Sequence, residues 1–242
     1  MRNRLILLVM GTAICVSLPT SDFAKAAPVK ELEDYTVTGS RIRIKPTDLG
    51  DRQRNLAITN FSRCLVGQAT PRVNYYLRNS DALASKENPQ KFFPMGECLG
   101  EAMGDADQSQ ARFSMLGLRG WLAEAAYLKA NKKYVVFAPD APPASPRQYF
   151  SIDGNLRLAK RIGEFSDCIV ARDPAGADAI LRTSRGSAAE FEAAKPFLAT
   201  LSACIDGKSE VSFNSETLRA YVADGLWQRY EAGKPSTFKG GN

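Results

Sequence analysis

The sequence contains no histidine, and this absence excludes several kinds of chemistry. A Ser-His or Cys-His nucleophile pair, a histidine-ligated zinc site and an imidazole general base all need that side chain. A glycine-rich phosphate loop is also missing, because residues 117–120 (Gly-Leu-Arg-Gly) lie in a helical pattern without the preceding strand of a dinucleotide fingerprint. We therefore predict no catalytic, metal or cofactor site, and the sequence favours a protein that is not an enzyme.

A concentrated basic patch is missing as well. The formal net charge is +6, and the charged residues are spread along the chain. Nucleic-acid binding usually needs cationic side chains clustered on one face. We therefore predict no nucleic-acid partner, and the expected partner is an unknown protein or small ligand.

Long apolar runs are scarce, and the one at the N-terminus is short. Residues 5–18 are apolar, follow Arg2 and Arg4, and precede the small residues of Ala24-Lys25-Ala26. This order is typical of a secretory signal peptide with cleavage after Ala26. A membrane span needs about 20 apolar residues, so stable membrane insertion is not expected. The sequence thus predicts a periplasmic or secreted protein.

Cysteine is used sparingly and in even number beyond the predicted signal peptide. An even count in an oxidising compartment indicates disulfide bonds rather than metal ligands or free thiols. The residues concerned are Cys64, Cys98, Cys168 and Cys204.

The second half of the sequence repeats motifs of the first half in the same order. Residues 61–66 (Phe-Ser-Arg-Cys-Leu-Val) recur as residues 165–170 (Phe-Ser-Asp-Cys-Ile-Val). Three further matches join residues 77–80 to 181–184, 98–99 to 204–205, and 118–124 to 218–224. The pattern indicates one module present twice. A module that folds alone must then pair Cys64 with Cys98 and Cys168 with Cys204, and loss of one bridge should largely spare the other module.

Each module is predicted to be helical, and the second is the easier to follow. Apolar residues at spacings of three and four predict a helix over residues 155–172. Asp173-Pro174 should begin a short helix through Leu181. Ser187 and Glu190 form a capping box for a helix towards Cys204. Pro196 is expected to kink or restart that helix.

The last helix of the second module should begin at Asn214 or Ser215 and stop near Gly233. The first module is expected to follow the same order. Its predicted helices are one before Gly67, one from Thr70-Pro71, one over residues 94–103 and one over residues 110–130. A short strand is possible at residues 134–137, and Leu118, Trp121 and Leu122 with their counterparts are core candidates.

The predicted fold is therefore all-α, with two tandem, related modules of about four helices each and one disulfide per module. The predicted order is a signal peptide (1–26), a flexible arm (27–50), module 1 (51–133), a Pro-rich linker (134–150), module 2 (151–233) and a tail (234–242).

Ion pairs between helices are the other structural feature that the repeated motifs predict. Arg119 and Glu124 lie five residues apart, as do Arg219 and Asp224. At this spacing the arginine and the acid of one helix do not lie on the same side of it and cannot pair with each other. Each side chain should instead pair with another element, and Arg78 and Arg182 are available to the two acids. The alternative is an anion-binding arginine pair in each module.

The repeated pattern resembles a group of small exported, cysteine-containing two-module proteins of sphingomonad-type alphaproteobacteria. The resemblance covers residues 52–130 and 155–232 and implies export and a two-module fold, without an activity. Residues 35–42 (Tyr-Thr-Val-Thr-Gly-Ser-Arg-Ile) resemble the TonB box of outer-membrane receptors. That resemblance implies an added strand on an energy-coupling protein, although the chain lacks the alternating strands of a receptor barrel.

The preferred function from sequence is an exported, non-enzymatic helical binding or structural module of unknown ligand. One alternative is an accessory of a TonB-linked outer-membrane uptake system, acting through residues 35–42. Another is a histidine-free hydrolase that uses carboxylates, which would need a groove with two acids about 5–10 Å apart.

Overall fold

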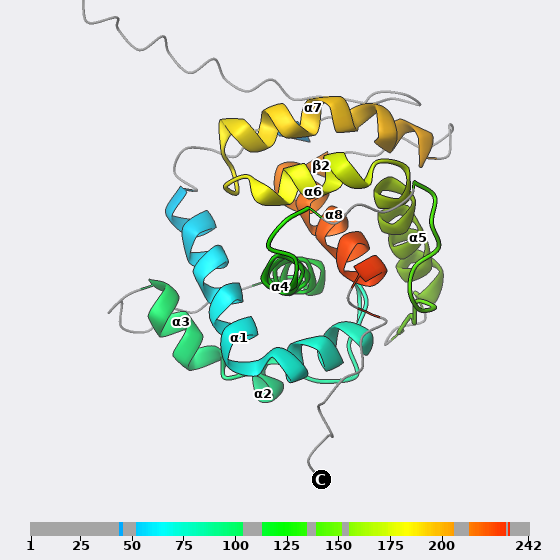
Figure 1. The fold of residues 1–242 in the computed structure, drawn as a ribbon. Coiled ribbons are helices and arrows are strands. Elements are labelled where there is room, and N and C mark those ends of the chain that lie inside the picture. The colour runs from blue at the N-terminus through cyan, green and yellow to red at the C-terminus, as the bar shows by residue number, and fades with distance from the viewer. Residues whose placement is uncertain are drawn as a thin grey trace, which may run out of the picture. The chain divides into compact units, whose positions relative to one another are not determined.

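A computed structural model describes residues 44–45, 52–103, 113–134, 139–151, 155–205, 213–230 and 232, all within one compact unit of the chain. The predicted signal peptide, residues 35–42 and the tail 234–242 lie outside these residues. The described part is mainly helical and has almost no strand, as predicted (Figure 1). Its helices are α1 (Arg52–Arg78), α2 (Pro89–Phe92), α3 (Met95–Met103), α4 (Met115–Ala130), α5 (Leu156–Arg172), α6 (Pro174–Arg182), α7 (Ala188–Ala203) and α8 (Ser215–Tyr230).

One short strand pair ties a segment before α1 to the start of α8. Strand β1 (Ile44–Lys45) pairs in parallel with β2 (Phe213–Asn214), with Ile44 opposite Phe213. These two residues of the predicted flexible arm are thus held against the second module. The predicted strand over residues 134–137 is not seen at Tyr134, and its other residues lie outside the described part.

Helix α1 is kinked where the sequence predicts a break. Ala69 has non-helical backbone angles (φ −136°, ψ 40°), and Pro71 follows two residues later without an N–H for the helical ladder. The Val66 carbonyl accepts hydrogen bonds from the Thr70 hydroxyl at 2.5 Å and from Lys129 Nζ at 3.1 Å. The Val66 carbonyl beside the kink is therefore bound, and α4 supplies one of its donors.

Side-chain caps set the starts of the later helices. Asp173 Oδ1 accepts from the Gly176 N–H at 2.8 Å, and Asn214 Oδ1 accepts from the Thr217 N–H at 2.7 Å, as the sequence suggests. Ser187 Oγ accepts from the Glu190 N–H at 3.1 Å. Helix α4 begins later than its predicted start near residue 110, because Ser114 caps it through the Gly117 N–H at 3.0 Å.

Helix α7 shows which outcome expected at Pro196 does not occur. The helix runs from Ala188 to Ala203 instead of restarting at the proline. Pro196 and Glu192 are both exposed, so water can bind the Glu192 carbonyl that the missing N–H leaves free.

The predicted disulfides are confirmed. Cys64 of α1 bonds to Cys98 of α3, and Cys168 of α5 bonds to Cys204, which ends α7. Each bridge closes a loop of similar sequence separation, 34 residues in one case and 36 in the other. In both halves the bridge ties the first helix to the helix that precedes α4 or α8.

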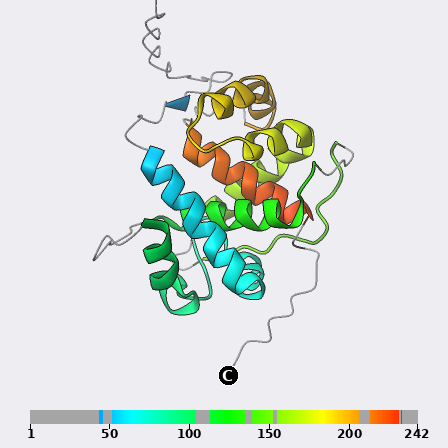
Figure 2. The ribbon, with the colours of Figure 1, turned by 60° about the vertical axis from the view of Figure 1, so that its left-hand side comes forward.

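Helix α4 lies at the centre, in contact with α1 on one side and α8 on the other (Figure 1). Figure 2 shows α1 lying across α4. Leu118 and Leu122 of α4 and Leu218 and Val222 of α8 are buried in one hydrophobic cluster that includes residues from both predicted modules. The two predicted modules therefore share a core.

The Pro-rich segment between the modules packs against both of them over its described residues 139–150. The Phe150 N–H donates to the carboxylate of Asp81 after α1, and the Asp140 N–H donates to the Ala171 carbonyl of α5 at 2.7 Å. This segment is thus part of the packed structure rather than a tether alone.

Candidate functional site

The four charged residues of the repeated α4 and α8 motifs form ion pairs between the two helices. Arg119 Nε of α4 donates to Asp224 Oδ1 of α8 at 2.8 Å. Arg219 of α8 donates to both oxygens of Glu124 of α4, from Nε at 2.9 Å and from Nη2 at 2.7 Å. The pairing is therefore reciprocal, since each helix supplies an arginine to the acid of the other.

The same two arginines also bind helix-end carbonyls. Arg119 Nη1 donates to the Leu77 and Ser80 carbonyls, each at 2.6 Å, at the end of α1. Arg219 donates to the Ile180 and Leu181 carbonyls, at 2.9 and 2.8 Å, near the end of α6. Carbonyls at the C-terminal end of a helix lack the N–H donors of a following turn, and among these only Ile180 also accepts a backbone N–H, from Thr183 at 3.3 Å. The matched residues 77–80 and 181–184 thus supply acceptors for a buried arginine.

Both acids are held ionised. Burial alone would raise the pKa of the Asp224 carboxyl, but the charges of Arg119 and Arg147 outweigh burial and lower it. Burial likewise acts to raise the pKa of Glu124, and the charges of Arg185 and Arg219 lower it below its ordinary value. A general acid near neutral pH needs a raised pKa, so these carboxylates are suited to structural ion pairs.

Arg78 and Arg182 do not meet the two acids as the sequence suggests. Arg78 Nε donates to the Ala232 carbonyl at 3.1 Å. Arg182 forms an ion pair with Asp178 one turn earlier in α6, and Asp178 also accepts from the Tyr127 hydroxyl at 2.8 Å. Because Arg119 and Arg219 are committed to ion pairs and carbonyls, the alternative of an anion-binding arginine pair at these positions gains no support.

Two arginines that sequence reasoning missed complete the buried pairs. Arg147, from the Pro-rich segment, binds Asp224, and Arg185, from the loop between α6 and α7, binds Glu124. Neither lies in a repeated motif, so their sequence positions carry no signal beyond charge. The two acids therefore receive their second arginine from unrelated segments.

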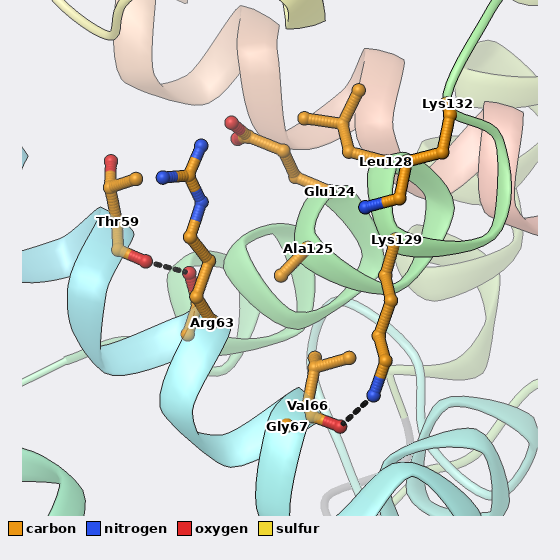
Figure 3. A pocket seen from close by; sticks show the side chains of 10 residues that line it. Thr59, Arg63, Val66, Gly67, Glu124, Ala125, Leu128, Lys129 and Lys132 are labelled. Atoms are coloured by element: carbon orange, nitrogen blue, oxygen red, sulfur yellow. Dashed lines mark hydrogen bonds between the residues drawn. The ribbon is translucent and has the colours of Figure 1, made fainter.

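A groove of about 340 Å³ opens between α1 and α4, next to Glu124 (Figure 3). We call it the α1–α4 groove. It is lined by Thr59, Ser62, Arg63, Val66, Gly67, Glu124, Ala125, Leu128, Lys129 and Lys132.

Cations outnumber acids among the residues that line this groove. Arg63 extends from α1 toward Glu124 on α4, and its charge helps to lower the pKa of that carboxyl (Figure 3). Lys129 reaches across from α4 to Val66 of α1. Lys132 adds a third cation, whereas Glu124 is the single acid among the lining residues. The acid pair that a carboxylate hydrolase requires is thus not present in this lining.

A second, more open hollow of about 630 Å³ lies beside the Cys64–Cys98 disulfide. It shares Arg63 and Gly67 with the α1–α4 groove and adds Gln68 and Glu101. Arg63 therefore borders both spaces.

The corresponding face of the second half, between α5 and α8, is filled by residues 145–149 of the chain itself. Gln228 of α8 donates to the Ser145 carbonyl at 3.4 Å, and Arg147 reaches Asp224. A Cβ atom on Gly163 of α5 would lie 2.5 Å from Arg147 Nε and 2.6 Å from the Tyr149 ring. We call residues 145–149 the inserted segment, because their side chains lie against both helices.

The described residues contain no group of three or more cysteine, aspartate or glutamate side chains placed to hold a metal ion. Within the same residues, no helix is both long and apolar enough to cross a membrane.

Comparison with known proteins adds no relative: no protein-family model, no curated protein and no solved structure matches this chain.

Proposed function

We propose that this chain is an exported, non-enzymatic helical binding protein, built from two duplicated modules, and that the α1–α4 groove is its ligand site. The observation that carries the proposal is the difference between the two halves. The inserted segment fills the face between α5 and α8, whereas the matching α1–α4 groove is open. Export is supported by the predicted signal peptide and by two disulfides, which persist in oxidising compartments.

The difference in filling has a structural cause. Asp224 receives its second arginine, Arg147, through the face between α5 and α8. Glu124 receives its second arginine, Arg185, from the loop between α6 and α7. No chain segment has to enter the α1–α4 groove to neutralise Glu124, so the space stays open to a ligand.

The groove has the size and the rigid walls of a small-molecule site. Its volume falls in the range of about 300–1,000 Å³ that is usual for ligand pockets. The Cys64–Cys98 bridge ties α1 to α3, and α4 is held in the core by Leu118 and Leu122. A site whose walls are fixed before binding loses less conformational entropy when the ligand binds.

The test obstructs the groove without disturbing the core. Gly67 lines the groove, and a Cβ atom there would meet nothing within 4 Å. Gly67→Trp should therefore fill the groove in a folded protein. Gly96→Trp on α3 is the matched control, because a Cβ atom there also meets nothing within 4 Å and Gly96 is not in the lining.

The purified full chain is incubated with a small-molecule extract of the cell envelope and examined by native mass spectrometry. We expect a bound adduct on the parent and on Gly96→Trp, and its loss on Gly67→Trp. An adduct that survives Gly67→Trp, or no adduct on any of the three proteins, would refute the groove as a ligand site.

A further inference from the structure

We propose that the ligand of the α1–α4 groove is a small anion with at least two carboxylate or phosphate groups; this inference rests on the proposed function. It comes from a charge difference between matched positions. In the second half, Arg229 Nη2 of α8 forms an ion pair with Asp167 Oδ2 of α5 at 3.0 Å. The residues in the matching places of α4 and α1 are Lys129 and Arg63.

The ion pair of one half is thus replaced by two cations in the other. Within the described part of the chain, no carboxylate lies in ion-pair distance of Arg63, which is exposed at the groove. Arg63 points toward Glu124 and Lys129 toward Val66, so positive charge lies at both ends of the groove (Figure 3). An anion that reaches both cations would lower the repulsion between their charges. Arg63 stands where the second half has the acid Asp167, and the absence of this acid therefore favours a negatively charged ligand.

Glu124 does not supply this missing charge. Its oxygens are already bound by Arg219, at 2.7 Å from Nη2, and by Arg185. The charges of Arg63, Lys129 and Lys132 remain in excess around the groove. A single monovalent anion would leave part of this charge uncompensated, so the lining favours a ligand with two or more negative groups.

The hydroxyl groups that line the groove already donate hydrogen bonds within α1, so the cations are the donors left for a ligand. The Thr59 hydroxyl donates to the Asn55 carbonyl at 2.9 Å, and the Ser62 hydroxyl donates to the Thr59 carbonyl at 3.1 Å. Both hydroxyl hydrogens are thus used within α1. Lys129 Nζ donates to Val66 and to Thr70, which leaves one of its three N–H groups for an oxyanion.

In the second half, the group that fills the face between α5 and α8 is positively charged. There the inserted segment brings a cation, Arg147, to the acid Asp224 beside the Asp167–Arg229 pair. The α1–α4 groove has an acid that is already doubly paired and two cations in place of the ion pair. An occupant of negative charge fits it, as one of positive charge fits the other half.

The test titrates the full chain with citrate and with inorganic pyrophosphate by calorimetry, at low and at high salt. We expect at least one probe to bind and its affinity to fall with salt. Arg63→Asp places in the groove the acid that the second half has at this position, and it should weaken binding by about tenfold or more. Arg161→Asp, an equal charge change on the exposed surface of α5, should leave the affinity unchanged. The probe that binds more tightly identifies carboxylate or phosphate as the preferred group.

Failure of both probes to bind the parent, or equal weakening by Arg63→Asp and Arg161→Asp, would overturn the inference. The adduct experiment separates this failure from failure of the proposed function. A neutral or cationic adduct that Gly67→Trp removes would leave the groove as a ligand site and refute its preference for anions.

Discussion

Gly120 of α4 and Ala220 of α8 hold matching positions in the repeated motifs and pack directly against each other where the two helices meet. A Cβ atom on Gly120 would lie 2.5 Å from Ala220 Cβ and 2.7 Å from Ala220 Cα. The reciprocal pairs of Arg119 with Asp224 and Arg219 with Glu124 lie beside this contact. The close approach therefore brings each arginine to the acid of the opposite helix.

The close contact predicts that Gly120→Ala is destabilising. The added methyl group meets backbone rather than a flexible side chain, so one helix must move. We expect a loss of about 1–3 kcal/mol in the free energy of unfolding, measured by urea denaturation. Gly100→Ala on α3 is the control, because its Cβ would meet nothing within 4 Å and alanine favours the helix. Equal stability of the parent and Gly120→Ala would contradict the packing.

The buried ion pairs predict a large cost when one partner is neutralised. Asp224→Asn leaves Arg119 and Arg147 without their carboxylate in the interior. We expect unfolding to become easier by about 3–5 kcal/mol. The control is Glu164→Gln, which removes an exposed pair with Lys160 and should cost less than about 1 kcal/mol. Similar losses in the free energy of unfolding for the two variants would show that the buried ion pair contributes no more to stability than the exposed one.

The lowered pKa values of Glu124 and Asp224 predict acid sensitivity. Their ordinary values are 4.5 and 3.8, and both are lower in the folded chain. Their contribution to stability is therefore fully present above about pH 5 and is lost as the pH falls through the folded-state values. Urea denaturation between pH 7 and pH 2.5 should show this loss, and Asp224→Asn should make it shallower. A parent whose stability is unchanged down to pH 2.5 would contradict it.

The shared core changes what is expected from loss of a disulfide. Independent modules would let Cys168→Ser with Cys204→Ser unfold one half and spare the other. Because α4 and α8 share a core and exchange ion pairs, we expect both halves to unfold together. The chain-entropy model puts the loss at about 3–4 kcal/mol.

The two tryptophans allow this to be measured, since Trp121 lies on α4 and Trp227 on α8. In the disulfide variant, Trp121→Phe and Trp227→Phe each leave one fluorescent reporter. The two denaturation curves should coincide. Two separated transitions would restore the view of independent modules.

The sequence alone determined the local structure of this protein. Helical periodicity and the caps at Asp173, Ser187 and Asn214 depend on neighbouring residues, so they can be read without the fold. The repeated motifs also determined the cysteine pairing, because a module that contains both partners can close its own bridge. The restart expected at Pro196 does not occur, and the exposure that lets the helix continue through this proline becomes known only once the helix is packed.

Tertiary structure decided everything that joins distant segments. The repeated motifs marked Arg119 and Asp224 as ion-pair candidates, but their pairing depends on how closely α4 approaches α8. Arg147 and Arg185 come from irregular segments whose paths follow no periodic rule. The open groove beside Arg63 likewise depends on the paths of those segments, because neither of them enters the space between α1 and α4.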